Sequence, residues 1–225
     1  MLRGPEHHHL VRVLRTRAGD KVWLFDEEGV RYRAEVVSSE KEESALSVLE
    51  ILPPLEMATR ITLAPALLKA KTMDDVVVRA TELGVARISP VESDRSVARA
   101  GEQAEKKVGR WSRIARTAAK QSRAAHVPEI DAPVPLRQFI ASCRAPQKIF
   151  LDERGGSSLK SLRTAGGPPP ANAAVLVGPE GGWSAAEVKA ISEAGFEPFG
   201  LGRTILRAET AVLAVLTILA YEWNW

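Results

Sequence analysis

The stretch that decides the fold of this chain reads Leu176-Val177-Gly178-Pro179-Glu180-Gly181-Gly182-Trp183-Ser184. It follows an apolar run, residues 173–177, which predicts a buried strand. The three glycines and the proline let the backbone turn sharply and leave N–H groups free to face a ligand. The pattern therefore predicts a strand that ends in a ligand-binding loop.

A second loop of the same kind follows, Leu201-Gly202-Arg203-Thr204-Ile205-Leu206-Arg207-Ala208-Glu209-Thr210-Ala211. Between the two loops, Ser184 and Glu187 form a capping-box pattern that opens a helix, and Gly195 ends it. Residues 196–200 then predict a short strand. Residues 208–222 are apolar on almost every side, which predicts a helix buried all round, and in a small domain such burial is often completed by another subunit.

Towards the N-terminus, strands and helices alternate from residue 60 onward. We expect strands at 61–66, 86–91 and 148–152, and a helix that Thr72 to Asp75 caps and Gly84 ends. Gly155-Gly156-Ser157-Ser158 and residues 165–170 have the composition of mobile loops. The alternation indicates an α/β domain.

The first sixty residues have a different pattern. Strands are expected at 21–26, 30–37 and 45–51, with turns at Gly19-Asp20 and Glu28-Gly29, which describes a small all-β unit. Pro53-Pro54 ends this unit, so residues 52–58 are the expected linker. We predict two domains, residues 1–57 and residues 58–225.

A helix expected at 102–123 has a strong charge pattern. One arc of about 140° contains six of its basic side chains, and Trp111 and Ile114 lie on the opposite, apolar face. These six are Lys106, Arg110, Arg113, Arg116, Lys120 and Arg123. Glu105 is the only acidic residue from 105 to 123, so we expect this stripe not to be neutralised locally. It fits either a solvated surface or a contact with phosphates.

Composition and missing motifs exclude several classes. The single cysteine, Cys143, rules out an intrachain disulfide, and neither an apolar leader nor an apolar run of roughly 20 residues is present, so we expect a soluble cytoplasmic protein and no membrane contact. No P-loop, G-x-G-x-x-G, H-E-x-x-H, C-x-x-C or G-x-S-x-G pattern occurs. His7-His8-His9 cannot all face one ion from a helix or strand, so no metal site is expected.

The two loops resemble the signature of the SPOUT-class 16S ribosomal RNA (uracil-N3)-methyltransferases. The matching motifs are Gly178-Pro179-Glu180-Gly181-Gly182, Leu201-Gly202 and Ile205-Leu206-Arg207-x-Glu209-Thr210-Ala211. Further matches keep the family's order and spacing over nearly the whole chain: His9-Leu10-Val11-x-Val13-Leu14-Arg15, Gly19-Asp20, Thr81-Glu82-Leu83-Gly84-Val85-x-x-Ile88-x-Pro90 and Val127-Pro128-x-Ile130. The resemblance implies a PUA-like β-barrel that helps grip RNA, followed by a trefoil-knotted, parallel-sheet methyltransferase domain that forms a homodimer.

The resemblance also implies a cofactor, S-adenosylmethionine, and a substrate, 16S rRNA within the small ribosomal subunit. The residues expected to hold the cofactor are Leu176, Val177, Gly178, Pro179, Glu180, Gly181, Leu201, Gly202, Ile205, Leu206, Thr210 and Ala211. Arg207 is the candidate to stabilise the uracil anion, and Glu209 or Glu180 could take its proton or instead hold loop backbone. The expected RNA contacts are Arg12, Arg15, Arg110, Arg113, Arg116, Gln121 and Arg123.

One segment departs from the family pattern. Lys120 replaces an acidic residue that family members tend to have before Val127-Pro128, so the roles of Gln121 and Arg123 are open. Two other functions also stay open: a SPOUT enzyme with another RNA target, and an RNA-binding assembly factor without turnover. The intact glycine loop disfavours the second, because a binding protein needs no cofactor loop.

Overall fold

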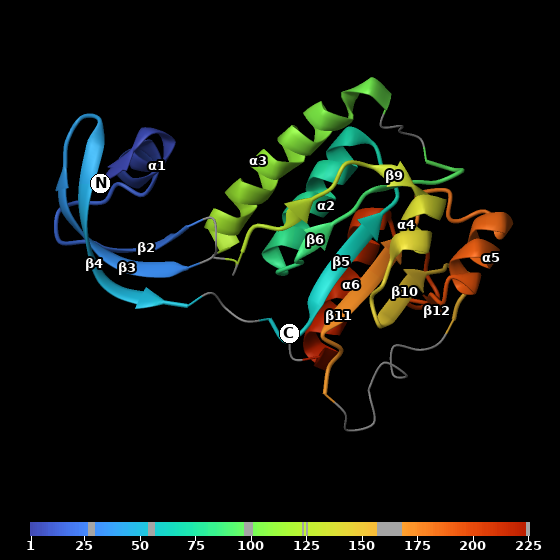
Figure 1. Ribbon diagram of the computed structural model, residues 1–225. Coiled ribbons are helices and arrows are strands. Elements are labelled where there is room, and N and C mark those ends of the chain that lie inside the picture. Colours follow the sequence, from blue (N-terminus) through green and yellow to red (C-terminus); the bar gives the residue numbers. More distant parts are fainter. Residues whose placement is uncertain are drawn as a thin grey trace. The chain divides into compact units, whose positions relative to one another are not determined.

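The computed structural model describes residues 1–26, 30–53, 57–96, 101–122, 124, 126–156 and 168–223. The chain divides into two compact units between residues 55 and 56, and each is considered by itself. The N-terminal unit is built on an antiparallel sheet and the C-terminal unit on a parallel sheet between helices, which confirms the predicted α/β fold class (Figure 1).

The N-terminal unit contains a four-stranded sheet with the order β1-β4-β3-β2. Its strands are β1 (Leu2–Arg3), β2 (Lys21–Phe25), β3 (Arg31–Ser39) and β4 (Glu43–Leu52). All pairs are antiparallel, and the three longer strands lie within two residues of the predicted ones. Leu10, Val22, Ala34 and Val36 form the core. The predicted turn at Glu28-Gly29 lies outside the described residues.

A short helix in this unit was not predicted. Helix α1 (Gly4–His8) leads into a π-helical turn, η1 (His9–Val13). His7 is buried there, with Nδ1 2.9 Å from the Ser44 hydroxyl and Nε2 3.3 Å from the Lys41 carbonyl oxygen. These contacts give His7 a structural role in the fold.

The C-terminal unit contains six parallel strands in the order β12-β10-β11-β5-β6-β8. They are β5 (Arg60–Pro65), β6 (Arg87–Ile88), β8 (Glu129–Ile130), β10 (Gln147–Leu151), β11 (Asn172–Val177) and β12 (Glu197–Phe199). A separate pair joins β7 (Val91–Glu92) to β9 (Val134–Pro135). The predicted strand at 86–91 is thus divided in two, because Pro90 has no N–H to continue the first sheet.

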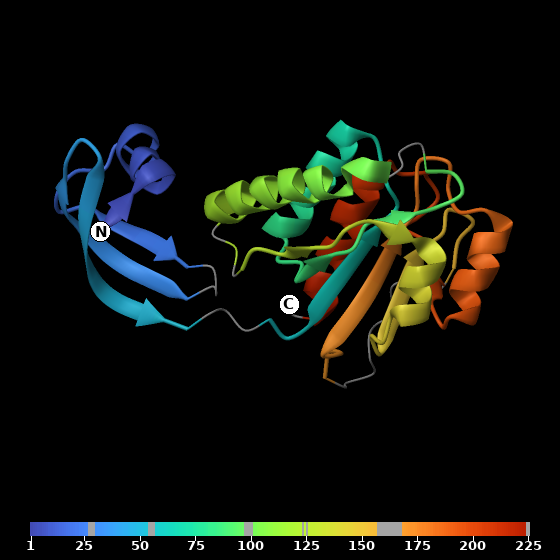
Figure 2. The same cartoon turned by 45° about the horizontal axis from the view of Figure 1, so that its top comes forward.

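Helices cover both faces of the parallel sheet (Figures 1 and 2). One layer contains α2 (Ala70–Glu82), α3 (Ala104–Ser122, after a 3₁₀ turn, η2, Gly101–Gln103) and α6 (Ala208–Trp223), and the other contains α4 (Leu136–Ser142) and α5 (Ala185–Glu193). Along β11, Val175 and Val177 pack with the first layer and Ala174 and Leu176 with the second. Burial on both faces explains why residues 173–177 are continuously apolar.

One helix prediction needs correction. Helix α2 begins at Ala70 without a side-chain cap, so the predicted cap at Thr72 was wrong; the Asp74 carboxylate pairs with Arg110 of α3 instead. Helix α6 is buried in part by this chain, with Leu213 37% and Tyr221 80% exposed, and the completion of its burial by another subunit stays a prediction. The predicted end of α2 is confirmed, since Gly84 has a φ of +73°.

Within the described ranges, none of the helices combines the length and the apolar character that crossing a membrane requires. The trefoil knot implied by the resemblance stays a prediction.

Candidate functional site

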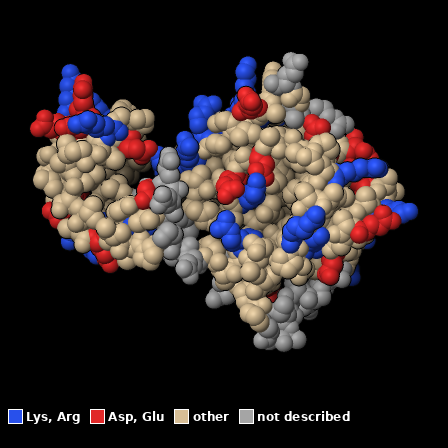
Figure 3. Space-filling model, viewed as in Figure 1, with Lys and Arg blue, Asp and Glu red and all other residues tan. Residues whose placement is uncertain are grey.

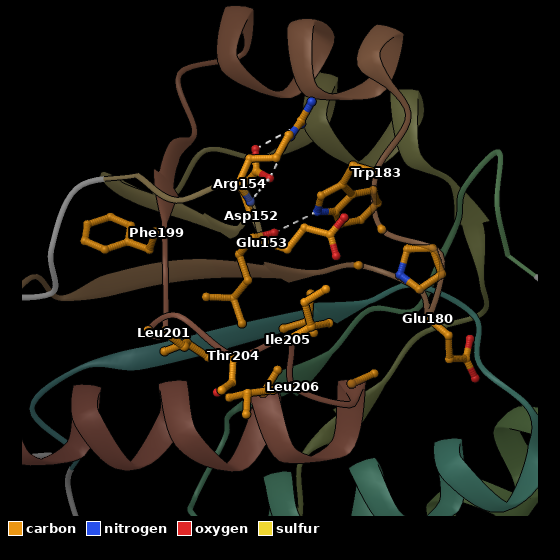
Figure 4. A pocket seen from close by; sticks show the side chains of 18 residues that line it. Asp152, Glu153, Arg154, Glu180, Trp183, Phe199, Leu201, Thr204, Ile205 and Leu206 are labelled. Carbon is orange, nitrogen blue, oxygen red and sulfur yellow. Dashed lines mark hydrogen bonds and ion pairs between the residues drawn. The ribbon is translucent and has the colours of Figure 1, made fainter.

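Three loops meet at the carboxyl ends of neighbouring parallel strands. Residues 152–156 follow β10, residues 178–182 follow β11 and residues 200–206 follow β12, and β10 lies between the other two strands. A crevice outside the carboxyl ends of parallel strands is the usual ligand position in an open α/β sheet. The loops enclose a pocket with α6 (Figure 4). Its lining is formed by Leu151, Asp152, Glu153, Arg154, Val177, Gly178, Pro179, Glu180, Gly182, Trp183, Phe199, Leu201, Gly202, Thr204, Ile205, Leu206, Ala208 and Ala211.

The loop after β11 is fixed by close backbone contacts. The Gly182 N–H donates to the Pro179 carbonyl at 2.9 Å, which closes a tight turn, and Gly182 has a φ of +66°. A Cβ on Gly178 would lie 3.2 Å from the Trp183 indole, so glycine lets this ring approach the backbone. The indole Nε1 donates to the Leu151 carbonyl at 3.1 Å. Trp183 thereby ties this loop to the end of β10.

The predicted capping box follows directly. The Ser184 hydroxyl accepts from the Glu187 N–H at 3.2 Å, and the Glu187 carboxylate accepts from the Ser184 N–H at 2.8 Å. Both groups that the sequence paired are therefore engaged at the start of α5.

The loop after β10 packs against β12 more tightly than its sequence suggests. A Cβ on Gly156 would lie 2.2 Å from the Pro198 carbonyl oxygen, a distance that no side chain could occupy without moving the backbone. The Asp152 N–H also donates to the Phe199 carbonyl at 3.0 Å. Gly155-Gly156 was expected to be part of a mobile loop. Gly156 is in close backbone contact with β12, directly after Asp152, Glu153 and Arg154, which line the pocket.

This loop supplies functional candidates that the sequence analysis missed. The Asp152 carboxylate, 9% exposed, accepts from Arg154 Nε and Nη2, each at 3.0 Å, and this hydrogen bonding raises the pKa of Arg154. In Figure 4 this ion pair lies on one side of the pocket, with Leu201 and Leu206 on the other. One signal in the sequence could have found it. The segment directly follows the predicted strand at 148–152, and in α/β folds the loops after parallel strands form the ligand site.

Most of the predicted cofactor residues come together here. The pocket lining includes Val177, Gly178, Pro179, Glu180, Leu201, Gly202, Ile205, Leu206 and Ala211. Leu176 is fully buried in the sheet, and Gly181 and Thr210 are exposed outside the lining.

The two catalytic candidates lie beside the pocket. Arg207 is exposed directly before α6, where its carbonyl accepts the Ala211 N–H at 2.8 Å, and Glu209 is partly buried in the first turn. Neither belongs to the lining, although their neighbours Leu206 and Ala208 do. Their roles stay predictions.

The predicted RNA contacts fall on separate surfaces. On α3, Arg110, Arg113 and Gln121 border a groove whose other lining residues are Val78, Ile114, Thr117 and Ala118. Arg116 is exposed outside this groove. Figure 3 shows Lys and Arg side chains gathered along the edge of the larger unit where Figure 1 draws α3. Arg12 and Arg15 are exposed in the N-terminal unit, and Arg123 lies outside the described residues.

The stripe on α3 is partly neutralised, contrary to expectation. Arg110 Nε donates to Asp74 Oδ1 of α2 at 3.1 Å, and a second, shorter bond joins Nη2 to Oδ2. This hydrogen bonding raises the pKa of Arg110. Arg113 Nε donates to the Gly109 carbonyl of its own helix at 3.3 Å. The sequence could not show that α2 supplies a carboxylate.

In the part of the chain that the structure describes, no cluster of three or more His, Cys, Asp or Glu side chains could hold a metal ion.

Comparison with known proteins shows the family to which the chain belongs. A family described as an RNA methyltransferase domain matches residues 55–220, and an RNA methyltransferase PUA domain matches residues 2–49. Ribosomal RNA small subunit methyltransferase E of Aquifex aeolicus is 34% identical, with 97% of this chain and 93% of that protein covered. The protein of the same name from Bacillus subtilis is 30% identical, with 97% and 88% covered.

Solved structures agree. The crystal structure of a ribosomal RNA small subunit methyltransferase E from Neisseria gonorrhoeae, bound to S-adenosyl methionine, matches with a TM-score of 0.87 and 30% identity over 99% of this chain and 91% of that one. A Legionella pneumophila protein described as a methyltransferase, in complex with the same cofactor, matches with a TM-score of 0.83 and 30% identity over 96% and 88%.

Proposed function

This chain belongs to the RNA methyltransferase family that includes ribosomal RNA small subunit methyltransferase E, and we propose that it methylates N3 of one uridine in 16S rRNA with S-adenosylmethionine as donor. One observation supports this most strongly. Most residues of the two glycine-loop motifs, although they come from two separate segments, line a single pocket at the carboxyl ends of β11 and β12.

The pocket fits S-adenosylmethionine. Leu201, Leu206 and Phe199 offer an apolar surface suited to an adenine ring, while the glycine loops bring backbone N–H and C=O groups within reach of the adenine edge and the ribose. Glu153 and Glu180 place carboxylates in the lining, where they would face the cationic donor. The donor supplies a methyl group already activated on a sulfonium, so the protein contributes mainly positioning.

Attack by N3 of uridine requires the loss of its proton. Glu180 is the proton acceptor candidate that lines the pocket, and Glu209 is the alternative in the first turn of α6. A cation beside the uracil carbonyls would stabilise the developing anion. Arg154 is paired with Asp152, which leaves the exposed Arg207 as the better candidate for this role.

RNA would be held by charges on both units. Arg113 and Arg116 on α3 are exposed, and Arg12 and Arg15 are exposed in the PUA-like unit. Contacts of this kind with phosphates position the RNA without reading its sequence. Gln121, which borders the groove on α3, could hydrogen-bond a base or a sugar.

We also propose that the protein works as a homodimer on the small ribosomal subunit in the cytoplasm. The exposed positions of α6, Thr210, Leu213, Thr217 and Tyr221, are three or four residues apart and so share one face. Leu213 and Tyr221 leave apolar surface on that face, and a second copy of the helix would bury it.

The test is a methylation assay with labelled S-adenosylmethionine. Small ribosomal subunits and free 16S rRNA, both lacking the native modification, would be incubated separately with the protein, and the product nucleoside identified by mass spectrometry. We expect 3-methyluridine. Another methylated nucleoside would indicate a different RNA target, and a protein that binds neither the donor nor S-adenosylhomocysteine would be an assembly factor.

Gly202→Val is the matched inactive variant. Gly202 has a φ of +125°, which a β-branched residue rarely adopts, yet a Cβ there would meet nothing within 4 Å. We therefore expect the variant to lose cofactor binding and methyl transfer while its unfolding remains cooperative. Undiminished affinity for S-adenosylhomocysteine in calorimetry would contradict the placement of the cofactor.

A further inference from the structure

Gly181 belongs to the glycine loop but does not line the pocket. Its carbonyl oxygen accepts a hydrogen bond from Arg95 Nη1 at 2.7 Å. A Cβ on Gly181 would lie 3.5 Å from Arg95 Cβ and 3.6 Å from Cδ, so the arginine side chain runs along the glycine. A guanidinium donor makes this a charge-assisted bond, which is stronger than a bond between neutral groups. The loop is thus held from its outer side.

Arg95 extends from a turn with its own supports. The Ser93 N–H donates to the Ser96 hydroxyl at 3.2 Å, and the two hydroxyls lie 2.8 Å apart. Both serines are buried, whereas Arg95 itself is exposed. The arginine therefore projects from a fixed base over the glycine loop.

The same turn is joined to the start of α5. The Asp94 N–H donates to Glu187 Oε1 at 2.8 Å, and the Ser184 hydroxyl donates to Asp94 Oδ2 at 2.7 Å. Glu187 is 8% exposed, and its second oxygen accepts the Ser184 N–H. The turn at 93–96 and the helix that follows the glycine loop consequently form one hydrogen-bonded unit.

We propose that Arg95 is a positioning residue that fixes the loop at 178–182 in the shape required for cofactor binding. This inference rests on the proposed function of the pocket. With Arg95 in place, Glu180 and Gly182 face the pocket on either side of a carbonyl that is held outward. Without it, the loop samples other conformations, and binding has to include the free energy of ordering it again.

The experiment compares S-adenosylhomocysteine binding to wild type, Arg95→Ala and Arg95→Gln by calorimetry. Arg95→Ala should raise the dissociation constant about tenfold, as expected for the loss of a hydrogen bond from a charged donor. Arg95→Gln keeps a donor without the charge and should recover part of the affinity. In the methylation assay, KM for the donor should rise while KM for RNA stays the same.

Arg144→Ala is the matched control. Arg144 is also an exposed arginine whose Nη1 donates to a backbone carbonyl, that of Ala141 at 2.8 Å, but this contact lies at the C-terminal end of α4. We expect its removal to leave the affinity unchanged. A general effect of deleting an arginine would appear in both variants.

Two outcomes would overturn the inference. One is an Arg95→Ala variant that binds S-adenosylhomocysteine as tightly as wild type. The other is a defect confined to KM for RNA, which would make Arg95 a phosphate contact. If Arg95→Ala does not fold, Arg95→Gln decides between the same outcomes. A wild-type protein that binds no cofactor would contradict the proposed function itself, so the two failures are distinguishable.

Discussion

The three-loop pocket and the basic face of α3 are built in different ways. The pocket is made by backbone segments in close contact. A Cβ on Gly156, next to the lining residues, would collide with the Pro198 backbone, and a Cβ on Gly178 would press against the Trp183 indole. The face of α3 is made by long side chains, and its charge depends on neighbouring elements, as the pairing of Arg110 with Asp74 shows.

The difference separates two kinds of information in a sequence. A glycine whose close contact lies within its own loop, as that of Gly178 with Trp183 does, can be recognised locally. How far an arginine on a helix is neutralised depends on acidic partners that only the folded chain brings near. We therefore expect the pocket to respond sharply to small changes in volume and the face of α3 to respond gradually to changes in charge.

The largest expected effect comes from adding a single methyl group to the loop after β10, whose residues 152–154 line the pocket. Gly156→Ala would place a Cβ 2.2 Å from the Pro198 carbonyl oxygen, so one of the two backbones must move. We expect the free energy of unfolding to fall by about 3 kcal/mol, with cofactor binding lost. Denaturant unfolding measures the free energy, and calorimetry of the folded variant with S-adenosylhomocysteine measures the binding.

Gly109→Ala is the same substitution made in α3. Gly109 lies within α3, where a Cβ would meet nothing within 4 Å, and alanine favours a helix more than glycine does. This variant should be more stable by about 0.5–1 kcal/mol. Equal effects of the two substitutions would remove the contrast between the regions.

Much of the pocket could be predicted for this reason. The apolar run before Gly178, the capping box at Ser184 and the stop at Gly195 are local signals, and the structure contains each of them. The lining residues 152–154 were missed because Gly156, which fixes their loop, makes its close contact with Pro198, more than forty residues away in sequence. Without knowledge of this distant partner, the composition of Gly155-Gly156 indicates an ordinary loop.

A smaller effect is expected from reversing charge on α3. Arg113→Glu combined with Arg116→Glu should weaken RNA binding and reduce the slope of log K against log salt by about 1.5 to 2, because fewer counterions are released. Fluorescence anisotropy with a 16S rRNA fragment at several salt concentrations measures the slope.

The matched reversal is made at Arg137 of α4 and at Arg144, two residues after the end of that helix, and both are exposed. It changes the net charge by the same amount and should leave the slope nearly unchanged. If both pairs lower the slope equally, the basic face of α3 has no special part in binding and is a solvated surface.

The fold away from the site shows the same limit of sequence reasoning. Helix α1 was missed because it is only five residues long, and His7 becomes buried only through Ser44 and Lys41, more than thirty residues away in sequence. The misplaced start of α2 has a related cause. Its Asp74, which is suited to a cap, is engaged by α3. In each case a tertiary partner decided the structure.

The smallest effect is a pH dependence at the end of α3. His126 is partly buried soon after this helix, and burial lowers its pKa below the usual value of 6.5; the charge of Arg60 acts in the same direction, and a hydrogen bond with the Val85 backbone opposes it. The unfolded chain therefore binds this proton at a higher pH than the folded one. The stability associated with neutral His126 is complete above about pH 6.5 and is lost as the pH falls towards the folded pKa. For one group the slope of the free energy of unfolding against pH cannot exceed about 1.4 kcal/mol per pH unit.

Urea unfolding between pH 5 and 8 measures this free energy. Its slope against pH should be shallower for His126→Gln than for wild type. If the two slopes are equal, His126 is not desolvated in solution, and its protonation does not affect the stability of the fold.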